Sequence, residues 1–353
     1  DRRPRPRPRR IRRSRSRSRS RRRRRRRTHS SLCCSSATCT LSVFTSAKRA
    51  EAAHAKAEYR RSIGLPTQFI DRATLAAAFR LEGAYGAILD PNSGQLNGAQ
   101  YVRSQRPVLV AQGVEIYEGT PVLKVDEGET IVLTTPKGTV RAKAIVLATN
   151  GYTSKLGYFR DAVFPLISHV FATAPLDPAG QLGCQRWAGF YDDMDRISYS
   201  SVTKEGQVIF GGGSPIGTAY NFNNGTRFNG RDAEAARISA SIEKGFQRYA
   251  PGGRGLPVAQ RWSGTLGLTL RRNVLMGVRG EDRNVFYAVG YNGHGVTLAN
   301  VAGQVLTDMY SGDDEKWRGL PFYQSSYTPI PPEPFRWVGY ELFTKIAGHL
   351  PRY

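Results

Sequence analysis

Cysteine is scarce in this sequence, and its spacing excludes two common uses. The 353 residues contain 4 cysteines. Cys33, Cys34 and Cys39 do not have the paired spacing of a zinc site, and Cys184 stands far from them. A disulfide framework would need more cysteines in a shorter chain. We therefore expect reduced, incidental cysteines and no metal centre.

Long hydrophobic runs are missing too. Residues 28–46 are rich in Ser, Thr and Cys, and their uninterrupted apolar run is far shorter than the ~18 residues that cross a membrane. The sequence therefore predicts no transmembrane segment. Acidic residues are nearly absent from the start of the chain, where Asp1 is the only one before Glu51.

Arginine dominates this acid-poor start. Residues 1–27 carry 18 Arg and one Asp, which supply +17 of the formal net charge of +24 and leave a mildly basic remainder at +7. Arg-Pro and Arg-Ser alternation followed by an unbroken Arg run cannot bury a core. We expect residues 1–46 to form a disordered, Arg/Ser-rich, low-complexity tail.

Three interpretations of this tail remain open. Its guanidinium groups could bind RNA phosphates, so nucleic acid is a candidate partner through residues 1–27. The Arg and Ser content also resembles a transit peptide for organellar import, although Arg21 to Arg27 offer no apolar face; without import, the expected location is cytoplasmic. The third interpretation is low-complexity sequence with no specific role, as a mistaken gene start would give.

The rest of the chain is patterned as helices and strands. Residues 47–62 are dense in helix formers and are followed by Gly64 and Pro66, so they predict a helix on which His54 is a solvated surface residue. A short helix is expected at 72–80, followed by a strand, a turn and another helix.

Two sheets are predicted further along. Residues 113–151 hold β-rich runs separated by glycine turns, and the last strand, 144–149, is uniformly apolar, as a central strand covered on both faces would be. Residues 157–213 alternate strands and turns like an antiparallel sheet. A helix capped by Asp232 should extend to residue 249 and pack on this sheet. Its buried face would hold Ile238, Ile242, Phe246 and Tyr249.

The strongest candidates for functional residues lie in a strand, a glycine turn and a helix near the C-terminus. The strand NVFYAVG leads through Gly290-Tyr-Asn-Gly-His-Gly295 straight into a helix at about 296–310. Such a turn directs backbone N–H groups and the positive end of the helix at an approaching anion or polar ring. Glycines remove the Cβ atoms that would block the approach. Many such turns hold glycines for steric reasons alone, so this motif by itself is weak evidence.

Four segments in order resemble the FAD-dependent D-amino-acid oxidase (DAO) family, which includes sarcosine, glycine and γ-glutamylputrescine oxidases. The segments are Thr120-Pro-Val122, AIVLATNGYTSKL at 144–156, RWSGTLGLTL at 261–270 and VFYAVGYNGHGVTLANVAGQVLTDMYSG at 285–312. The resemblance runs from about Ala47 to the C-terminus.

The resemblance implies an α/β fold of mixed α+β character, in which a partial FAD/NAD(P)-binding Rossmann-like domain is interleaved with an antiparallel-sheet substrate domain. The DAO-like domain would span 47–353. Its parts would be cofactor-side segments at about 97–156 and 261–312, a substrate sheet at about 64–96 and 157–260, and a C-terminal extension at 313–353, where PPEPFRW is expected to be extended.

Cofactor contacts are implied along all four segments. Val122 would contact the adenine side of FAD, and Trp262 to Gly264 would pass near the flavin. Closure of the cofactor domain over the dinucleotide would involve Thr149, Asn150 and Gly151. The residues against the isoalloxazine ring would be Gly290, Tyr291, Asn292, Gly293, His294, Gly295 and Val296. His294 is the candidate catalytic residue, tuning the flavin or orienting substrate; a structural histidine is the alternative.

The sequence departs from the family in one respect that bears on activity. The family begins with a strand, a G-x-G-x-x-G turn and a helix that hold the FAD pyrophosphate, and nothing before Ala47 fits this pattern. GGGSPIG at 211–217 follows a strand of the substrate sheet, so we interpret it as a strand-end loop. We expect a chain without the N-terminal cofactor unit, with an inactive fragment as one alternative. No cysteine lies at 261–280, so FAD would be bound non-covalently.

The implied reaction oxidises a C–N bond of a small amine or amino acid by hydride transfer to flavin. Imine hydrolysis and reoxidation by oxygen or another acceptor would follow. Tyr199, Arg271 and Arg272 are substrate-binding candidates, the arginines through an ion pair with a carboxylate. The alternative function is RNA binding through the Arg/Ser-rich tail.

Overall fold

The computed structural model describes residues 40–177, 181–182, 189–194, 196–212, 218–220 and 233–346. Residues Thr38–Tyr353 form one compact unit, and the other unit, Asp1–Ala37, lies outside the described residues. The RNA-binding, transit-peptide and low-complexity interpretations of the start fall there, and all four cysteines also lie outside the described residues. Among the helices of the described ranges, none is long and apolar enough to span a membrane.

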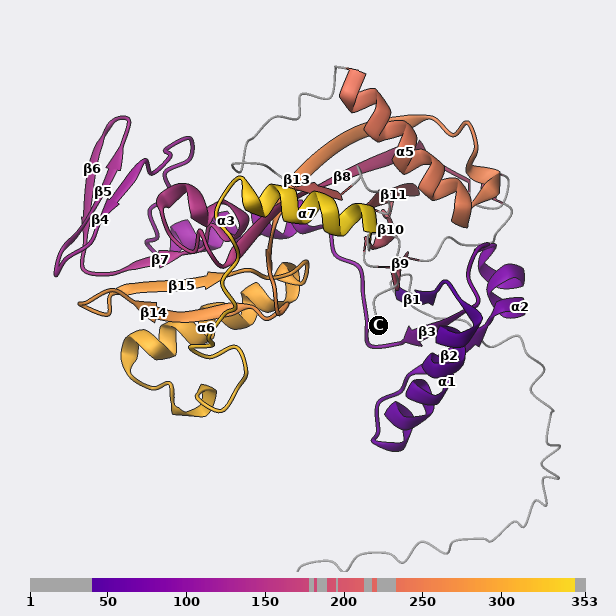
Figure 1. Cartoon of the computed structure of the whole chain (residues 1–353), viewed down its shortest axis with the longest axis horizontal. Helices are drawn as coiled ribbons and strands as arrows, with labels where there is room; N and C mark the ends of the chain where they lie inside the picture. Colours follow the sequence, from indigo (N-terminus) through magenta and orange to yellow (C-terminus); the bar gives the residue numbers. More distant parts are fainter. Residues whose placement is uncertain are drawn as a thin grey trace, which may run out of the picture. The chain divides into compact units, whose positions relative to one another are not determined.

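A nine-stranded sheet forms the larger part of the fold (Figure 1). Its strand order is β12-β8-β11-β10-β9-β1-β3-β2, and β13 also pairs with β8, from Val163 to Thr173. All pairs are antiparallel except β1 with β9. The strands are β1 (Thr40–Phe44), β2 (Gln68–Asp71), β3 (Gly86–Asp90), β8 (Val163–Pro175), β9 (Gly189–Asp192), β10 (Ser198–Val202), β11 (Gln207–Gly212), β12 (Thr218–Tyr220) and β13 (Val258–Thr269).

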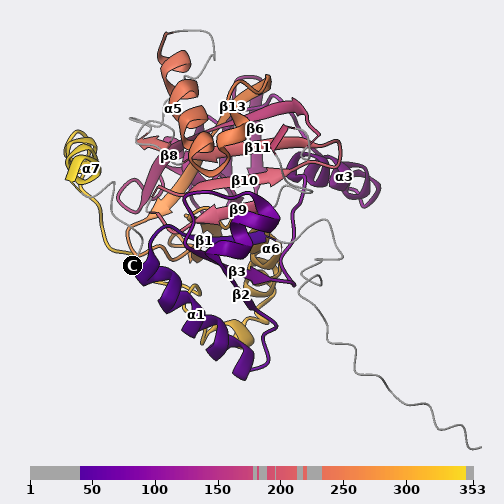
Figure 2. The ribbon, with the colours of Figure 1, turned by 90° about the vertical axis from the view of Figure 1, so that its right-hand side faces the viewer.

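Helix α5 (Ala233–Tyr249) packs on β8 and β11 of this sheet (Figure 2). The predicted stripe is confirmed, because the four expected side chains are buried: Ile238, Ile242, Phe246 and Tyr249. They meet an aromatic layer from the sheet, in which the Phe210 and Phe246 ring centroids are 5.3 Å apart and those of Phe171 and Phe246 are 5.7 Å apart. Asp232, the expected cap, lies outside the described residues.

A three-stranded sheet carries the glycine turn. Its order is β14 (Leu275–Arg279), β15 (Val285–Val289) and β7 (Ile145–Leu147), with β15 and β7 parallel. Helix α6 (Gly295–Ser311) covers one face through Val305 and Leu306, while Phe159 and Val163 pack on the other. A second small antiparallel sheet contains β4 (Lys124–Asp126), β5 (Ile131–Thr135) and β6 (Gly138–Ala142).

Most of the remaining helices lie at the positions that the sequence predicts. Helix α1 (Ala47–Ser62) has the predicted bounds and leaves His54 exposed. The region predicted as one short helix divides into α2 (Arg72–Thr74) and the π-helical η1 (Leu75–Phe79). The others are α3 (Gly98–Ala111), the 3-10 helices η2 (Asn150–Leu156), η4 (Pro251–Gly253) and η5 (Glu315–Trp317), and α7 (Phe335–Ile346).

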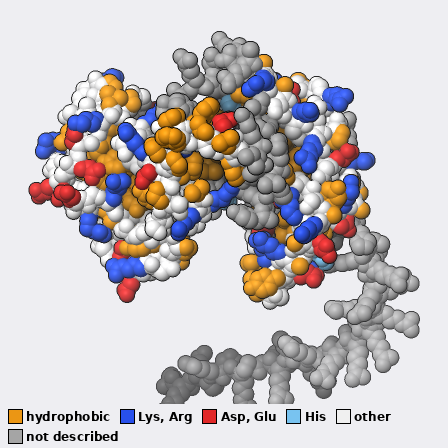
Figure 3. Space-filling model, viewed as in Figure 1, with side chains coloured by type: hydrophobic (Ala, Val, Ile, Leu, Met, Phe, Trp, Pro, Cys, Tyr) orange, Lys and Arg blue, Asp and Glu red, His pale blue; other side chains and the backbone are white. Residues whose placement is uncertain are grey.

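Two expectations about the ends of the chain were wrong. Residues 40–44, expected to belong to the disordered tail, form β1, because Leu41 and Val43 are fully buried between β3 and β9. PPEPFRW was expected to be extended, but Glu333 and Pro334 form a turn and α7 begins at Phe335. This helix leaves Phe335, Leu342 and Phe343 exposed, and a hydrophobic patch lies over it (Figure 3).

Two expectations about strands also need correction. Residues 144–149 were expected to form a covered central strand, but among the described strands β7 pairs only with β15, and Val146 is 57% exposed. An open hollow of about 570 Å³ separates this edge from α6. Residues 261–269 form β13 in the nine-stranded sheet, and their place on the cofactor side stays a prediction. Residues 113–117 form no strand.

We predict that Tyr249→Phe destabilises the fold. The Tyr249 hydroxyl donates a buried 2.6 Å hydrogen bond to Asp192 Oδ2. Burial raises the pKa of Asp192, and hydrogen bonds from Tyr249 and Ser198 oppose that rise. Losing the donor should lower the free energy of unfolding at pH 7 by about 1–3 kcal/mol. The raised pKa of Asp192 favours its protonation in the folded state as the pH falls. The drop in unfolding free energy caused by Tyr249→Phe should therefore become smaller at lower pH. Urea unfolding at several pH values measures this; a loss that grows toward acid would contradict it.

Candidate functional site

The turn between β15 and α6 uses a backbone conformation that glycine and asparagine tolerate best. Gly290, Asn292 and Gly293 have φ values of 70°, 54° and 87°. A Cβ atom on Gly290 would lie 2.5 Å from Thr269 Cγ2, so this glycine also permits close contact with β13. Gly293 faces open space instead. The turn therefore packs inward at its first glycine and opens outward at its second.

The buried side chain of Asn292 fastens the turn to the end of β13. Its backbone N–H donates to the Gly267 carbonyl oxygen at 3.0 Å, and its Oδ1 accepts from the Thr269 N–H at 2.8 Å. Its Nδ2 donates to the Gly290 carbonyl oxygen. One side chain thus satisfies backbone groups on both segments, where an unpaired buried group would cost about 1–3 kcal/mol.

Asn150 fastens the same turn from the opposite side. It follows β7 with φ 41°, and its Oδ1 accepts from the backbone N–H groups of Gly290 at 3.1 Å and Tyr291 at 3.4 Å. Gly151 lies against β13, where a Cβ atom would be 3.0 Å from the Leu266 backbone. Three segments distant in sequence therefore meet at one point: the start of η2, the end of β13 and the turn.

The first turn of α6 is open to an incoming ligand. His294 occupies its N-cap position without a side-chain cap hydrogen bond, and the first turn has no acidic residue. By contrast, Ser46 caps α1 and Asn97 caps α3 through their side-chain oxygens. The N–H groups and positive dipole end of α6 are thus available to an electron-rich group. His294 is exposed, and Val296 is 59% exposed.

Strand β13 offers an uncovered surface near this turn. Trp262 pairs with Val170 and is 40% exposed, and Gly264 pairs with Ser168 and faces open space. Residues two apart share a face of a strand, so Trp262 and Gly264 lie on the same face. The Tyr199 hydroxyl is 2.9 Å from Ser168 Oγ, and burial raises the pKa of Tyr199, so this hydroxyl is neutral at physiological pH.

Of the other predicted site residues, Val122 belongs to none of these segments, whereas Thr149 directly precedes Asn150, and Arg271 and Arg272 follow the end of β13. Val122 is half-buried just before β4, and Thr149 is exposed with its Oγ1 2.8 Å from Thr153 Oγ1. Arg271 and Arg272 are exposed in the turn after β13, and Arg271 Nε donates to Thr328 Oγ1 at 2.7 Å. Gly211 and Gly212 of GGGSPIG end β11, and residues 213–217 lie outside the described ranges.

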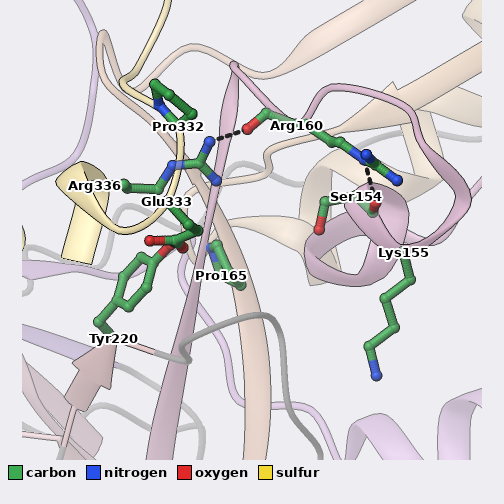
Figure 4. A pocket seen from close by; sticks show the side chains of 8 residues that line it. All are labelled: Ser154, Lys155, Arg160, Pro165, Tyr220, Pro332, Glu333 and Arg336. Carbon is green, nitrogen blue, oxygen red and sulfur yellow. Dashed lines mark hydrogen bonds between the residues drawn. The ribbon is translucent and has the colours of Figure 1, made fainter.

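Sequence reasoning missed two groups of residues. Gly267 and Thr269 anchor Asn292; they lie in the segment 261–270 that resembles the family, but nothing in that segment singled them out. The second group lines a cavity of about 380 Å³ (Figure 4). Its members come from segments that no motif connected: Ser154, Lys155, Arg160, Pro165, Tyr220, Pro332, Glu333 and Arg336.

The described residues fit the flavin end of FAD. A planar ring needs close access to backbone, and Gly264 and Gly293 leave open space where side chains would stand. The exposed side chains of Trp262 and Val296 offer apolar contact. The uncapped start of α6 offers N–H donors to polar ring atoms. The sequence contains no G-x-G-x-x-G turn for the pyrophosphate.

Comparison with known proteins decides the family. A family model described as FAD dependent oxidoreductase, DAO, matches residues 3–309. The chain belongs to this DAO family. The resemblance inferred from the four segments is thereby confirmed, and the family is FAD-dependent.

Relatives in the DAO family include the probable oxidoreductase OrdL of Rhizobium meliloti, 27% identical over 252 residues, which cover 69% of this chain and 54% of the relative. The gamma-glutamylputrescine oxidoreductase of Escherichia coli is 26% identical over 245 residues, covering 67% of this chain and 54% of the relative. The chain thus spans about half the length of the curated relatives it matches.

Solved structures confirm the mixed α/β fold. Glycine oxidase from Geobacillus kaustophilus has a TM-score of 0.69 at 18% identity, covering 83% of this chain and 76% of that chain. L-proline dehydrogenase from P. horikoshii has a TM-score of 0.65 at 19% identity, covering 82% of this chain and 76% of that chain.

We predict that Gly290→Ala destabilises this DAO-family chain more than Gly293→Ala. Both replacements strain a positive φ by about 1–2 kcal/mol, but only Gly290 has Thr269 Cγ2 in the way. The overlap should add about 1–3 kcal/mol to the loss in unfolding free energy. Thr269→Ser removes that methyl group and keeps the hydroxyl, so it should recover part of the added loss. Equal losses for the two glycine variants, with no rescue, would refute the contact.

We also predict that Asn150 stabilises the turn through its acceptor oxygen. Asn150→Gly keeps the positive φ but removes the acceptor for the Gly290 and Tyr291 N–H groups, and should cost about 1–3 kcal/mol in unfolding free energy. Asn150→Asp retains an acceptor and should cost less. Chemical denaturation measures both; the reverse order would contradict the role of Asn150 Oδ1 as the acceptor.

Proposed function

We propose that this chain binds FAD non-covalently against the turn Gly290 to Val296 and oxidises a C–N bond of a small amine or amino acid. The observation that carries the proposal is the open, uncapped start of α6, held in place by Asn150 and Asn292. Membership of the DAO family supports the cofactor, and relatives named for γ-glutamylputrescine, sarcosine and glycine support the substrate class.

FAD, when bound, would supply the hydride acceptor and electron sink. The chain's own part is positioning. Asn150 and Asn292 fix the turn so that its N–H groups do not reorganise during the reaction, and the positive end of α6 favours negative charge beside it. Trp262 and Val296 would exclude water from an apolar ring face.

The reaction needs a neutral amine. Its α-carbon loses a hydride while the nitrogen lone pair forms the C=N bond, and water then hydrolyses the imine to a carbonyl compound and free amine or ammonia. The Tyr199 and Ser168 hydroxyls on the β8 and β10 side are uncharged, so they can orient an amine without protonating it. The roles of His294, Arg271 and Arg272 stay predictions, as do the electron acceptor and the cellular location.

We predict that the purified protein carries flavin and that Gly264→Val removes much of it. The absorbance should be released on denaturation, since the flavin is non-covalent. Valine fits a strand, and no atom lies within 4 Å of a Cβ at Gly264, so the variant should fold while filling the space the ring would use. Bound flavin per protein should fall at least about tenfold, which is a loss of ~1.4 kcal/mol in binding.

The matched control is Gly319→Val, because a Cβ at Gly319, in the C-terminal extension outside the cofactor-side segments, also meets open space. It should keep the wild-type flavin content. Urea unfolding of both variants shows that folding is retained. A colourless wild-type protein after incubation with FAD, or equal flavin in Gly264→Val and wild type, would overturn the proposed site.

A further inference from the structure

The glycines that end β11 lie beneath an aromatic ring. Tyr199 of β10 pairs directly with Gly211 of β11. A Cβ atom on Gly211 would lie 2.6 Å from the Tyr199 hydroxyl oxygen and 2.7 Å from Cζ of the same ring, and a Cβ atom on Gly212 would lie 3.2 Å from Cε1. The ring of Tyr199 therefore lies across β11, in space that side chains at these two positions would fill.

The two glycines are required for different reasons. Gly212 has φ 72°, and its Cβ would lie 2.1 Å from the Ile197 carbonyl oxygen, so the backbone alone requires glycine there. Gly211 does not have a positive φ, and the three atoms nearest to its Cβ position all belong to the Tyr199 side chain. Because these atoms form the far end of a rotatable side chain, an alanine at 211 would displace the ring and spare the backbone. Glycine at 211 thus makes room for Tyr199.

By crossing β11, the Tyr199 side chain brings its hydroxyl to β8. The hydroxyl oxygen is 2.9 Å from Ser168 Oγ, and Ser168 is buried. Gly211 pairs with Val170 of β8, so Ser168, two residues before Val170, lies on the same face of the sheet as Gly211. A side chain that starts on β10 therefore meets its hydrogen-bond partner two strands away.

The hydroxyl pair lies beside the open part of β13. Ser168 pairs with Gly264, and no atom lies within 4 Å of a Cβ at Gly264. Directly paired residues of an antiparallel sheet share one face, with Cα atoms roughly 4.5–5.5 Å apart. Trp262, which is partly exposed, lies on this face too. The two hydroxyls are thus one strand away from the space that we assign to the flavin ring.

This pair has hydrogen-bonding capacity left for a ligand. One hydroxyl donates to the other, so one O–H group and lone pairs on both oxygens remain. Oxidation of an amine needs the nitrogen lone pair, because that lone pair forms the C=N bond as the α-carbon loses its hydride. An oxygen that accepts the amine N–H leaves this lone pair free. A fixed hydroxyl acceptor beside Gly264 therefore suits an amine that is to be oxidised.

We propose that Gly211 is a positioning residue: by leaving room for the Tyr199 ring, it keeps the Tyr199 and Ser168 hydroxyls together beside Gly264, where they accept the N–H group of an amine. This inference rests on the proposed function, because the amine would react with flavin bound in that space. Gly211 touches no reacting atom and acts only through Tyr199. The segment GGGSPIG, which fits no cofactor motif, thereby contributes to the orientation of the substrate.

The first test follows the ring itself. In fluorine NMR of protein labelled with 3-fluorotyrosine, the Tyr199 signal is the one that Tyr199→Phe lacks. Gly211→Ala should shift this signal because the ring is displaced, and Ser168→Ala should shift it because the hydroxyl loses its partner. The matched control is Gly245→Ala, whose Cβ would make an ordinary 3.6 Å contact with Phe210 and should leave the signal in place. A Tyr199 signal that Gly211→Ala does not shift would refute the positioning role.

The second test measures amine binding by calorimetry, with propylamine and the purified full chain. Wild-type protein should bind propylamine. Gly211→Ala, Ser168→Ala and Tyr199→Phe should each weaken binding about five- to tenfold, as expected for one lost hydrogen bond. In the Tyr199→Phe background, Gly211→Ala should have no further effect, because the glycine acts through the hydroxyl. No binding by the wild type, unchanged binding by Gly211→Ala or additive losses would each contradict the inference.

These measurements need neither flavin nor turnover, so the inference and the proposed function can fail separately. Colourless protein that binds propylamine through this hydroxyl pair would support the inference and refute the oxidase. Protein that carries flavin and oxidises amines, but whose Gly211→Ala variant binds propylamine as the wild type does, would refute the inference and leave the oxidase standing.

Discussion

The site depends on two asparagine side chains that satisfy the backbone of one glycine turn. The turn has three positive φ values and makes only some of its hydrogen bonds within itself, such as His294 N–H to the Tyr291 carbonyl oxygen, so its other polar groups need partners from outside. Asn150 supplies an acceptor from the strand β7 side, and Asn292 bonds to Thr269 and Gly267 at the end of β13. Because each asparagine reaches a different sheet, the turn also joins the three-stranded sheet to the nine-stranded one.

This arrangement explains why the start of α6 can remain open. In α1 and α3 a side-chain oxygen satisfies an early N–H group, as isolated helices require. In α6 the asparagines hold the preceding turn, so no cap is needed to fix where the helix begins. The unsatisfied N–H groups are then left for a ligand, and Gly293 keeps the approach clear.

Sequence reasoning succeeded where the determining forces are local. The bounds of α1 follow from its helix formers and the Ser46 cap, and the buried stripe of α5 follows from its spacing. It failed where pairing is distant. The parallel contact of β1 with β9 joins residues 40–43 to residues 189–192, and no short-range pattern carries that information. The turn was predictable from its glycines, but the partners of Asn150 and Asn292 were not.

The C-terminal segment shows how one buried charge can override a hydrophobic pattern. An apolar stripe predicts that a helix turns Phe335 and Leu342 inward, yet both are exposed in α7. The inward side chain is Arg336, whose guanidinium donates hydrogen bonds to the Pro331 and Arg160 carbonyl oxygens. The orientation of α7 therefore follows from the cavity wall.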